Sequence, residues 1–142
     1  MENKRRYKYF TRESRIGDKM TTYTIDKDGN SIEISKATSK PSDRHFRGAW
    51  TLSGTVISED MATAKTIFKD KIREVRKPLL EAQDVAFMKA LEAGDSSAQT
   101  TAKNAKTKLR DAPAASAITN AETIAKLKAA WDTDLLGTSP YA

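Results

Sequence analysis

The pattern of apolar and polar positions changes its period once along the chain, near residue 58. Before that point, short alternating runs separated by turn formers predict β-hairpins. After it, apolar residues recur every three or four positions from Met61 to Leu91, with Lys, Arg, Asp and Glu between them. This spacing predicts one apolar stripe along a helix of about 30 residues, roughly 45 Å long. Because a domain this small needs no such helix for its own core, we expect an assembly component.

Two hairpins are predicted before the long helix. In residues 22–34, alternating strands flank a turn at residues 27–30, where Gly29 accepts a positive φ angle without penalty. In the second hairpin, residues 49–52 and 55–57 flank the Ser53-Gly54 turn. Together they predict one small sheet of three or four short strands, which the long helix covers.

Capping and helix-breaking residues predict where the helices begin and end. Ser58 is the expected N-cap of the long helix, and Pro78 predicts a kink or a break within it. Gly94 is placed to end this helix as its C′ residue. Capping-box patterns at Ser96 and at Thr119 predict two shorter helices, the first to about residue 110 and the second through residue 131.

The expected fold class is therefore α+β: a small N-terminal antiparallel β-sheet of hairpins, followed by a long Pro-kinked helix and two shorter helices. Pro113 separates the two shorter helices, and the segment after Trp131 carries turn formers without clear periodicity. The predicted organisation is a basic arm, a hairpin unit, a helical region and a C-terminal tail: 1–19, 20–57, 58–131 and 132–142.

Composition argues against catalysis. The chain has no cysteine and one histidine, His45, which we interpret as a structural or surface residue. No glycine-rich phosphate-binding motif is present, and the acids alternate with Lys and Arg as on solvated helix faces. We expect no enzyme, no cofactor and no metal. No apolar run approaches the roughly 18–20 residues of a membrane span, so no membrane partner is expected.

Three groups of residues are candidates for partner binding. Residues 1–19 hold seven Lys or Arg against three acids, interleaved with aromatic side chains, and we favour a protein contact there over nucleic acid. The arginines and aromatics of residues 44–50 either anchor a partner or form the core of the sheet, and the core is favoured. Beyond Pro78, apolar positions exceed what a small sheet can cover. The candidates are Tyr7, Tyr9 and Phe10; Arg44, Phe46, Arg47 and Trp50; and Val85, Met88 and Leu91.

Four words of the sequence carry a resemblance to a known family. They are FRGAWTL, IREVRKPLLEAQDVAFMKALEAGD, LRDAP and IAKLKAAW, which lie in this order between Arg44 and Trp131. In order and spacing they resemble small tailed-bacteriophage proteins of the tail fibre assembly or tail assembly chaperone-like family. The resemblance implies a tail or tail-fibre context and no catalytic residues.

We therefore expect a structural adaptor that joins a tail fibre or baseplate component to its neighbour. The expected partners are other tail or tail-fibre proteins, or a second copy of the chain. Its expected location is the virion tail, and the host cytoplasm during assembly. The alternative is an assembly chaperone that does not remain in the virion. A third hypothesis is a nucleic-acid-binding protein that uses the basic arm.

Overall fold

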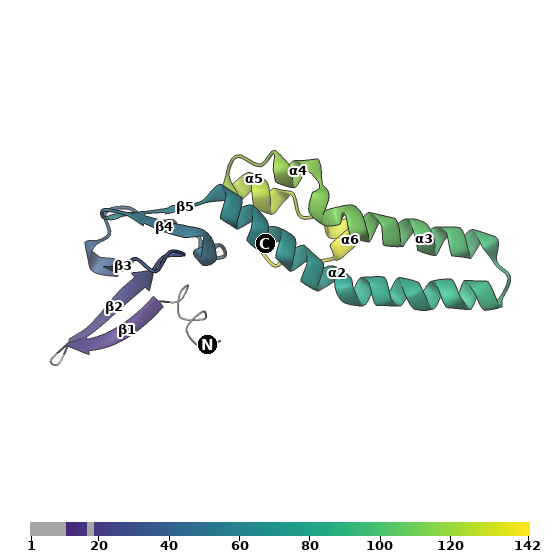
Figure 1. Cartoon of the computed structure of the whole chain (residues 1–142), viewed down its shortest axis with the longest axis horizontal. Helices are drawn as coiled ribbons and strands as arrows, with labels where there is room; N and C mark the ends of the chain where they lie inside the picture. The colour runs from purple at the N-terminus through teal and green to yellow at the C-terminus, as the bar shows by residue number, and fades with distance from the viewer. Residues whose placement is uncertain (1–10, 17–18) are drawn as a thin grey trace. The chain divides into compact units, whose positions relative to one another are not determined.

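A computed structural model describes residues 11–16 and 19–142 of the chain. The predicted α+β class is confirmed, because small antiparallel sheets precede a long helix and shorter helices (Figure 1). The chain forms two compact units, unit 1 up to Ile67 and unit 2 from Phe68, and the division falls within the long helix α2 (Met61–Glu92). Each unit is described by itself below.

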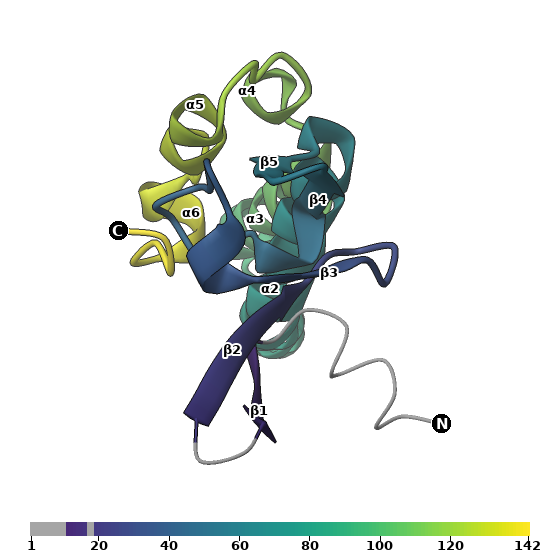
Figure 2. The same ribbon diagram turned by 90° about the vertical axis from the view of Figure 1, so that its left-hand side faces the viewer.

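Unit 1 contains two sheets instead of the single sheet that we predicted. Strands β1 (Thr11–Ile16), β2 (Lys19–Ile25) and β3 (Ser31–Glu33) form an antiparallel sheet in that order. Strands β4 (Trp50–Ser53) and β5 (Val56–Glu59) form a separate antiparallel pair (Figure 2). Strand β1 lies in the segment that sequence analysis assigned to the basic arm, and it pairs with β2 along its whole length.

Both predicted hairpins are present. The turn between β2 and β3 has Gly29 at a φ of 89°, and the turn between β4 and β5 has Gly54 at a φ of 61°. These angles lie in the left-handed region that glycine adopts without a steric cost. The local signals were therefore sufficient to identify both turns.

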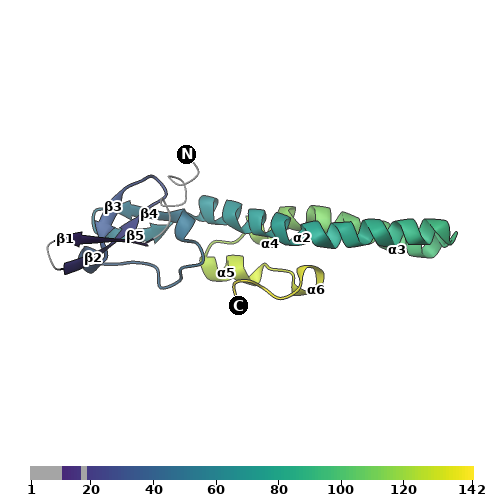
Figure 3. The same ribbon diagram turned by 90° about the horizontal axis from the view of Figure 1, so that it is seen from below.

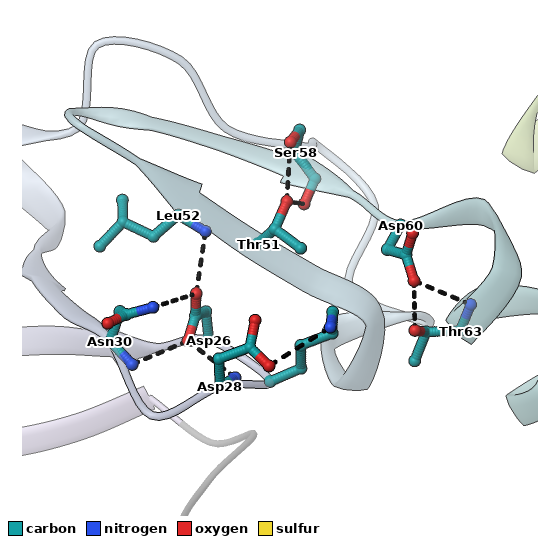
Figure 4. Close-up of polar contacts among 9 residues, drawn as sticks. Asp26, Asp28, Asn30, Thr51, Leu52, Ser58, Asp60 and Thr63 are labelled. Atoms are coloured by element: carbon teal, nitrogen blue, oxygen red, sulfur yellow. Dashed lines mark hydrogen bonds and ion pairs between the residues drawn. The ribbon is translucent and has the colours of Figure 1, made fainter.

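A buried carboxylate, that of Asp26, joins the two sheets of unit 1 (Figure 4). Its Oδ1 accepts hydrogen bonds from the backbone N–H groups of Asp28 at 2.9 Å and Asn30 at 2.8 Å. Its Oδ2 accepts one from Asn30 Nδ2 at 3.2 Å and one from the Leu52 backbone N–H in β4 at 3.0 Å. The Asp26 carboxylate thus fixes its own turn and ties that turn to the second sheet.

Helix α2 begins at Met61, later than predicted, and Asp60 replaces Ser58 as its N-cap. The Asp60 Oδ2 atom accepts a hydrogen bond from the Thr63 backbone N–H at 3.1 Å and another from the Thr63 hydroxyl. Ser58 belongs to β5, where its hydroxyl lies 2.9 Å from that of Thr51 (Figure 4). Strand pairing continues to the register pair of Trp50 and Glu59, so the helix cannot begin earlier.

Helix α2 continues through Pro78 to Glu92, so the alternative of a break at the proline is wrong. The helix ends as predicted at Gly94, which has a φ of 68°. The Gly94 N–H donates to the Leu91 carbonyl at 3.1 Å, and the Asp95 N–H donates to the Ala90 carbonyl at 2.9 Å. These two bonds form a Schellman motif, which pairs carbonyl groups that the end of the helix leaves open.

In unit 2, α3 (Ser96–Asp111) runs back alongside α2 (Figure 1), and three short helices follow (Figure 3). They are α4 (Ser116–Thr119), α5 (Ile124–Ala129) and α6 (Thr133–Leu136). The N-caps of α3 and α5 are Asp95 and Thr123, each of which accepts a backbone N–H, so the predicted caps at Ser96 and Thr119 are wrong. Helix α6 also lies in the segment where no periodicity was found.

An aromatic cluster forms part of the core of unit 2. The Phe68 ring stacks on Tyr141 at a centroid distance of 5.4 Å and meets the edge of Trp131 at 5.8 Å. The Trp131 Nε1–H donates to the Gly137 carbonyl at 3.0 Å, which holds the C-terminal segment in place. Other buried apolar residues of the unit are Ile72, Ala90, Ala102, Leu109, Ile118, Ala121, Leu127 and Leu136.

Candidate interaction surface

The first group of candidate residues, Tyr7, Tyr9 and Phe10, lies outside the described residues. Their expected contact with a partner stays a prediction.

The second group divides between core and surface. Phe46 and Trp50 are 0% and 3% exposed, so they belong to the core of unit 1, and their interpretation as partner anchors does not fit this burial. Arg47 is half-buried, and its guanidinium lies 5.8 Å from the centroid of the Trp50 ring. Burial, with a smaller effect from the charge of Arg44, lowers the pKa of Arg47. Only Arg44 remains an exposed candidate of this group.

The third group lies on the exposed surface of α2. Val85, Met88 and Leu91 are 55%, 53% and 51% exposed, and they follow one another at intervals of three residues. We call these three residues the apolar row. Three large apolar side chains on one exposed helix segment are more than isolated surface residues, and clusters of this kind mark binding sites in soluble proteins.

Burial along α2 changes at Pro78. Before the proline, Ala64, Phe68 and Ile72 are each 1% exposed or less. After it, Ala90 is the only buried residue of this helix among the described residues, although apolar residues remain frequent. Within unit 2, the Phe68 ring contacts Trp131 and Tyr141, so the C-terminal segment covers part of the α2 face that we expected the sheet to cover.

Charged side chains join α2 to α3 in unit 2. Arg76 Nη1 donates to the Arg110 carbonyl at 2.8 Å and to the Leu109 carbonyl at 3.3 Å. Nearer the Gly94 turn, Lys106 forms an ion pair with Asp84. Sequence analysis did not single out Arg76. The C-terminal end of a helix carries a partial negative charge that attracts cations. Arg76 of α2 meets that end of α3, but the sequence alone does not show that the two lie close together.

One cavity of unit 2, of about 620 Å³, is lined by the acids Asp111, Asp132 and Asp134 beside Lys108. No group of three metal-ligating side chains occurs among the described residues. His45 Nδ1 lies 2.9 Å from Asp43 Oδ1, and its interpretation as a structural or surface residue stays a prediction.

No helix within residues 11–16 and 19–142 has the length and apolar character that crossing a membrane requires. Comparison of the chain with models of protein families, with curated proteins and with solved structures finds no match in any of the three.

Proposed function

We propose that this protein is a structural adaptor of a bacteriophage tail, which joins a fibre or baseplate component to its neighbour. The observation that carries the proposal is the apolar row of Val85, Met88 and Leu91, each more than half exposed on α2. Burying one such side chain completely from full exposure contributes about 1.5–3 kcal/mol, so covering the exposed half contributes about half as much. Three of them in one row contribute enough to decide an association. The tail context rests on the resemblance of residues 44–131 to tail assembly proteins.

The composition of the chain supports a binding role over a catalytic one. Charged residues make up 31% of the sequence and hydrophobic residues 38%. Such a chain builds modest cores, and a long helix with an exposed apolar row gains stability from a partner. The partner in this proposal is another tail protein or a second copy of the chain.

The central experiment replaces two residues of the apolar row with aspartate. Because Met88 and Leu91 are exposed, Met88→Asp/Leu91→Asp leaves the melting temperature nearly unchanged, but the buried charges prevent docking. The measurement is the recovery of each variant in gradient-purified phage particles by quantitative mass spectrometry. The matched control, Thr100→Asp/Asn104→Asp, adds the same charge to exposed positions of α3 and should enter particles normally.

The wild-type protein in the same experiment separates the adaptor from the alternative. A stoichiometric amount in genome-filled particles supports the adaptor. Presence in infected cells but absence from particles supports an assembly chaperone, which also needs an exposed apolar row to hold its client. Unfolding of the Met88→Asp/Leu91→Asp variant would remove the main physical argument for both roles.

A further inference from the structure

A basic groove lies between α2 and α3 in unit 2. It consists of two cavities, of about 250 Å³ and about 280 Å³, which share Arg110 as a wall. The first also contains Lys69, Arg73 and Arg76, and the second also contains Phe87, Lys103 and Lys106. No acidic side chain lines either cavity. Six cations therefore converge on one groove of a chain whose net charge is only +6.

The cations of the groove are only partly neutralised by the protein itself. Arg73 pairs with Asp70 at 2.7 Å, and Lys106 pairs with Asp84. The charged groups of Lys69, Lys103 and Arg110 have no hydrogen bond or ion pair within the described part of the chain. Three cations thus remain available to an anion, and cavity walls of low dielectric strengthen their field.

Arg76 places a guanidinium in the groove at a position fixed by two hydrogen bonds. Its Nη1 atom donates to the carbonyls of Leu109 and Arg110, so the guanidinium is held in position without a carboxylate partner. A guanidinium carries five N–H donors in a rigid plane, and those that do not face the carbonyls remain able to bind an oxyanion. A site that is held in place in advance binds with a smaller loss of entropy.

The surroundings of the groove favour a protein ligand. Phe87 lines the second cavity, and the next residue, Met88, belongs to the exposed apolar row. The carboxylates of Asp70 and Asp84, more than half exposed beside Arg73 and Lys106, oppose a continuous chain of phosphates. A polypeptide can place its acids on the free cations and its apolar side chains on the row, whereas a nucleic-acid backbone cannot.

We propose that the basic groove binds an acidic segment of the partner protein, one that carries both carboxylates and large apolar side chains. This inference rests on the proposed adaptor function, because it names the chemistry of the partner that the apolar row contacts. The groove supplies charge recognition, and the row supplies apolar burial.

The test measures binding of a fluorescein-labelled peptide of alternating Glu and Leu to the full-length protein by fluorescence anisotropy. We expect saturable binding that weakens with added salt, and about tenfold weaker binding to Lys69→Glu/Arg110→Glu, which reverses two charges without breaking an observed ion pair. The control Lys89→Glu/Lys108→Glu changes the net charge equally, one residue on each helix, outside the groove. Its affinity for the peptide should stay within about twofold of the wild type.

Several results would overturn the inference. Among them are no binding of the peptide, equal losses in the groove and control variants, and tighter groove-dependent binding of a single-stranded oligonucleotide than of the peptide. The same peptide with Gln in place of Glu should bind at least tenfold more weakly, and equal binding also contradicts the inference. If Lys69→Glu/Arg110→Glu enters particles normally while Met88→Asp/Leu91→Asp does not, the adaptor function stands and the groove inference fails.

Discussion

The Asp26 side chain is a buried centre of hydrogen bonding in unit 1. It is 2% exposed, and its two oxygens accept four hydrogen bonds from Asp28, Asn30 and Leu52. Burial alone raises the pKa of Asp26, but the hydrogen bonds outweigh burial, and the pKa lies below its ordinary value. The hydrogen bonds therefore stabilise the ionised form of the Asp26 carboxylate.

Replacing Asp26 removes one of the hydrogen bonds that join its turn to β4, while the Lys27 N–H still donates to the Trp50 carbonyl at 3.0 Å. Asp26→Ala should lower the free energy of unfolding by about 2–4 kcal/mol, because it leaves three part-buried backbone N–H groups without their acceptor. Urea denaturation followed by circular dichroism provides the measurement. Asp28→Ala is the control, since the Asp28 carboxylate is exposed and pairs only with Lys27. Equal losses in both variants would show that the turn tolerates the loss of the buried carboxylate.

The pKa values of Asp26 and Asp60 predict how stability depends on pH. Hydrogen bonds from Thr63 lower the pKa of Asp60. Hydrogen bonds from Leu52, Asn30 and Asp28 lower the pKa of Asp26. Each carboxylate binds a proton more readily in the unfolded chain than in the folded protein. Its contribution to the free energy of unfolding is therefore complete above about pH 4, and it is lost as the pH falls through the lower pKa of the folded protein.

We therefore expect faster amide exchange in residues 26–52 at pH 3 than at pH 5, after correction for the intrinsic exchange rate. Asp26→Asn should weaken this dependence, because the amide does not titrate. A dependence of the same size in Asp26→Asn would assign it to other carboxylates.

Helix α2 carries a local defect at Pro78. The proline has no N–H, so the Glu74 carbonyl lacks the hydrogen bond that position 78 normally donates within a helix. Pro78 is also exposed, so its ring contributes little to the core. The helix nevertheless continues to Glu92, so the residues on either side of the proline offset the cost of this defect.

Replacing Pro78 with alanine should stabilise the protein. Pro78→Ala restores the missing donor and a strong helix former, which should raise the free energy of unfolding by about 1–3 kcal/mol. Thermal denaturation followed at 222 nm is the measurement. The neighbouring exposed residue serves as the control, and Lys77→Ala should change stability by less than about 0.5 kcal/mol. A lower melting temperature of Pro78→Ala would mean that the proline itself makes stabilising contacts.

Most of the elements could be predicted from the sequence, but β1, α4, α6 and several boundaries could not. Gly29, Gly54 and Gly94 marked turns correctly, because a positive φ is a local requirement that few other residues meet. N-caps depend on where the preceding structure ends. Ser58 looks like a cap in isolation, but β5 continues through it, so Asp60 takes the role.

The segment after Trp131 packs against the aromatic core of unit 2 through Tyr141. Tyr141, the second-last residue, stacks on Phe68 and meets the edge of Trp131 at 6.0 Å. Burial, with a smaller effect from the Glu74 charge, raises the pKa of its phenol to about 12. Residues that the sequence marks only as a tail thus complete an aromatic cluster.

Removing the Tyr141 ring should destabilise unit 2. Tyr141→Ala removes two ring contacts and part of the cover over Phe68, which should lower the free energy of unfolding by about 2 kcal/mol. Hydrogen exchange should increase within residues 68–142, and mass spectrometry of peptides from this region is the measurement. Tyr141→Phe keeps the ring and should lose much less. An unchanged exchange pattern in Tyr141→Ala would exclude the cluster as a major source of stability.

The candidate surface could be predicted only where it depended on one element. The exposure of Val85, Met88 and Leu91 follows from a count of apolar positions on a single helix. The sequence alone could not decide the roles of Phe46 and Trp50, because aromatic residues with this spacing occur both in protein cores and in interfaces. The basic groove needs Arg76 and Arg110 to meet across two helices, which no local pattern specifies.

The positions of the two tryptophans give the protein its own optical reporters. The chain contains two tryptophans, and each unit buries one of them, Trp50 at 3% exposure and Trp131 at 5%. An indole that passes from a protein interior into water shifts its emission to longer wavelength. Trp131→Phe leaves an emitter only in unit 1, and Trp50→Phe leaves one only in unit 2. The unfolding of each unit can thus be followed separately by fluorescence, without an attached dye.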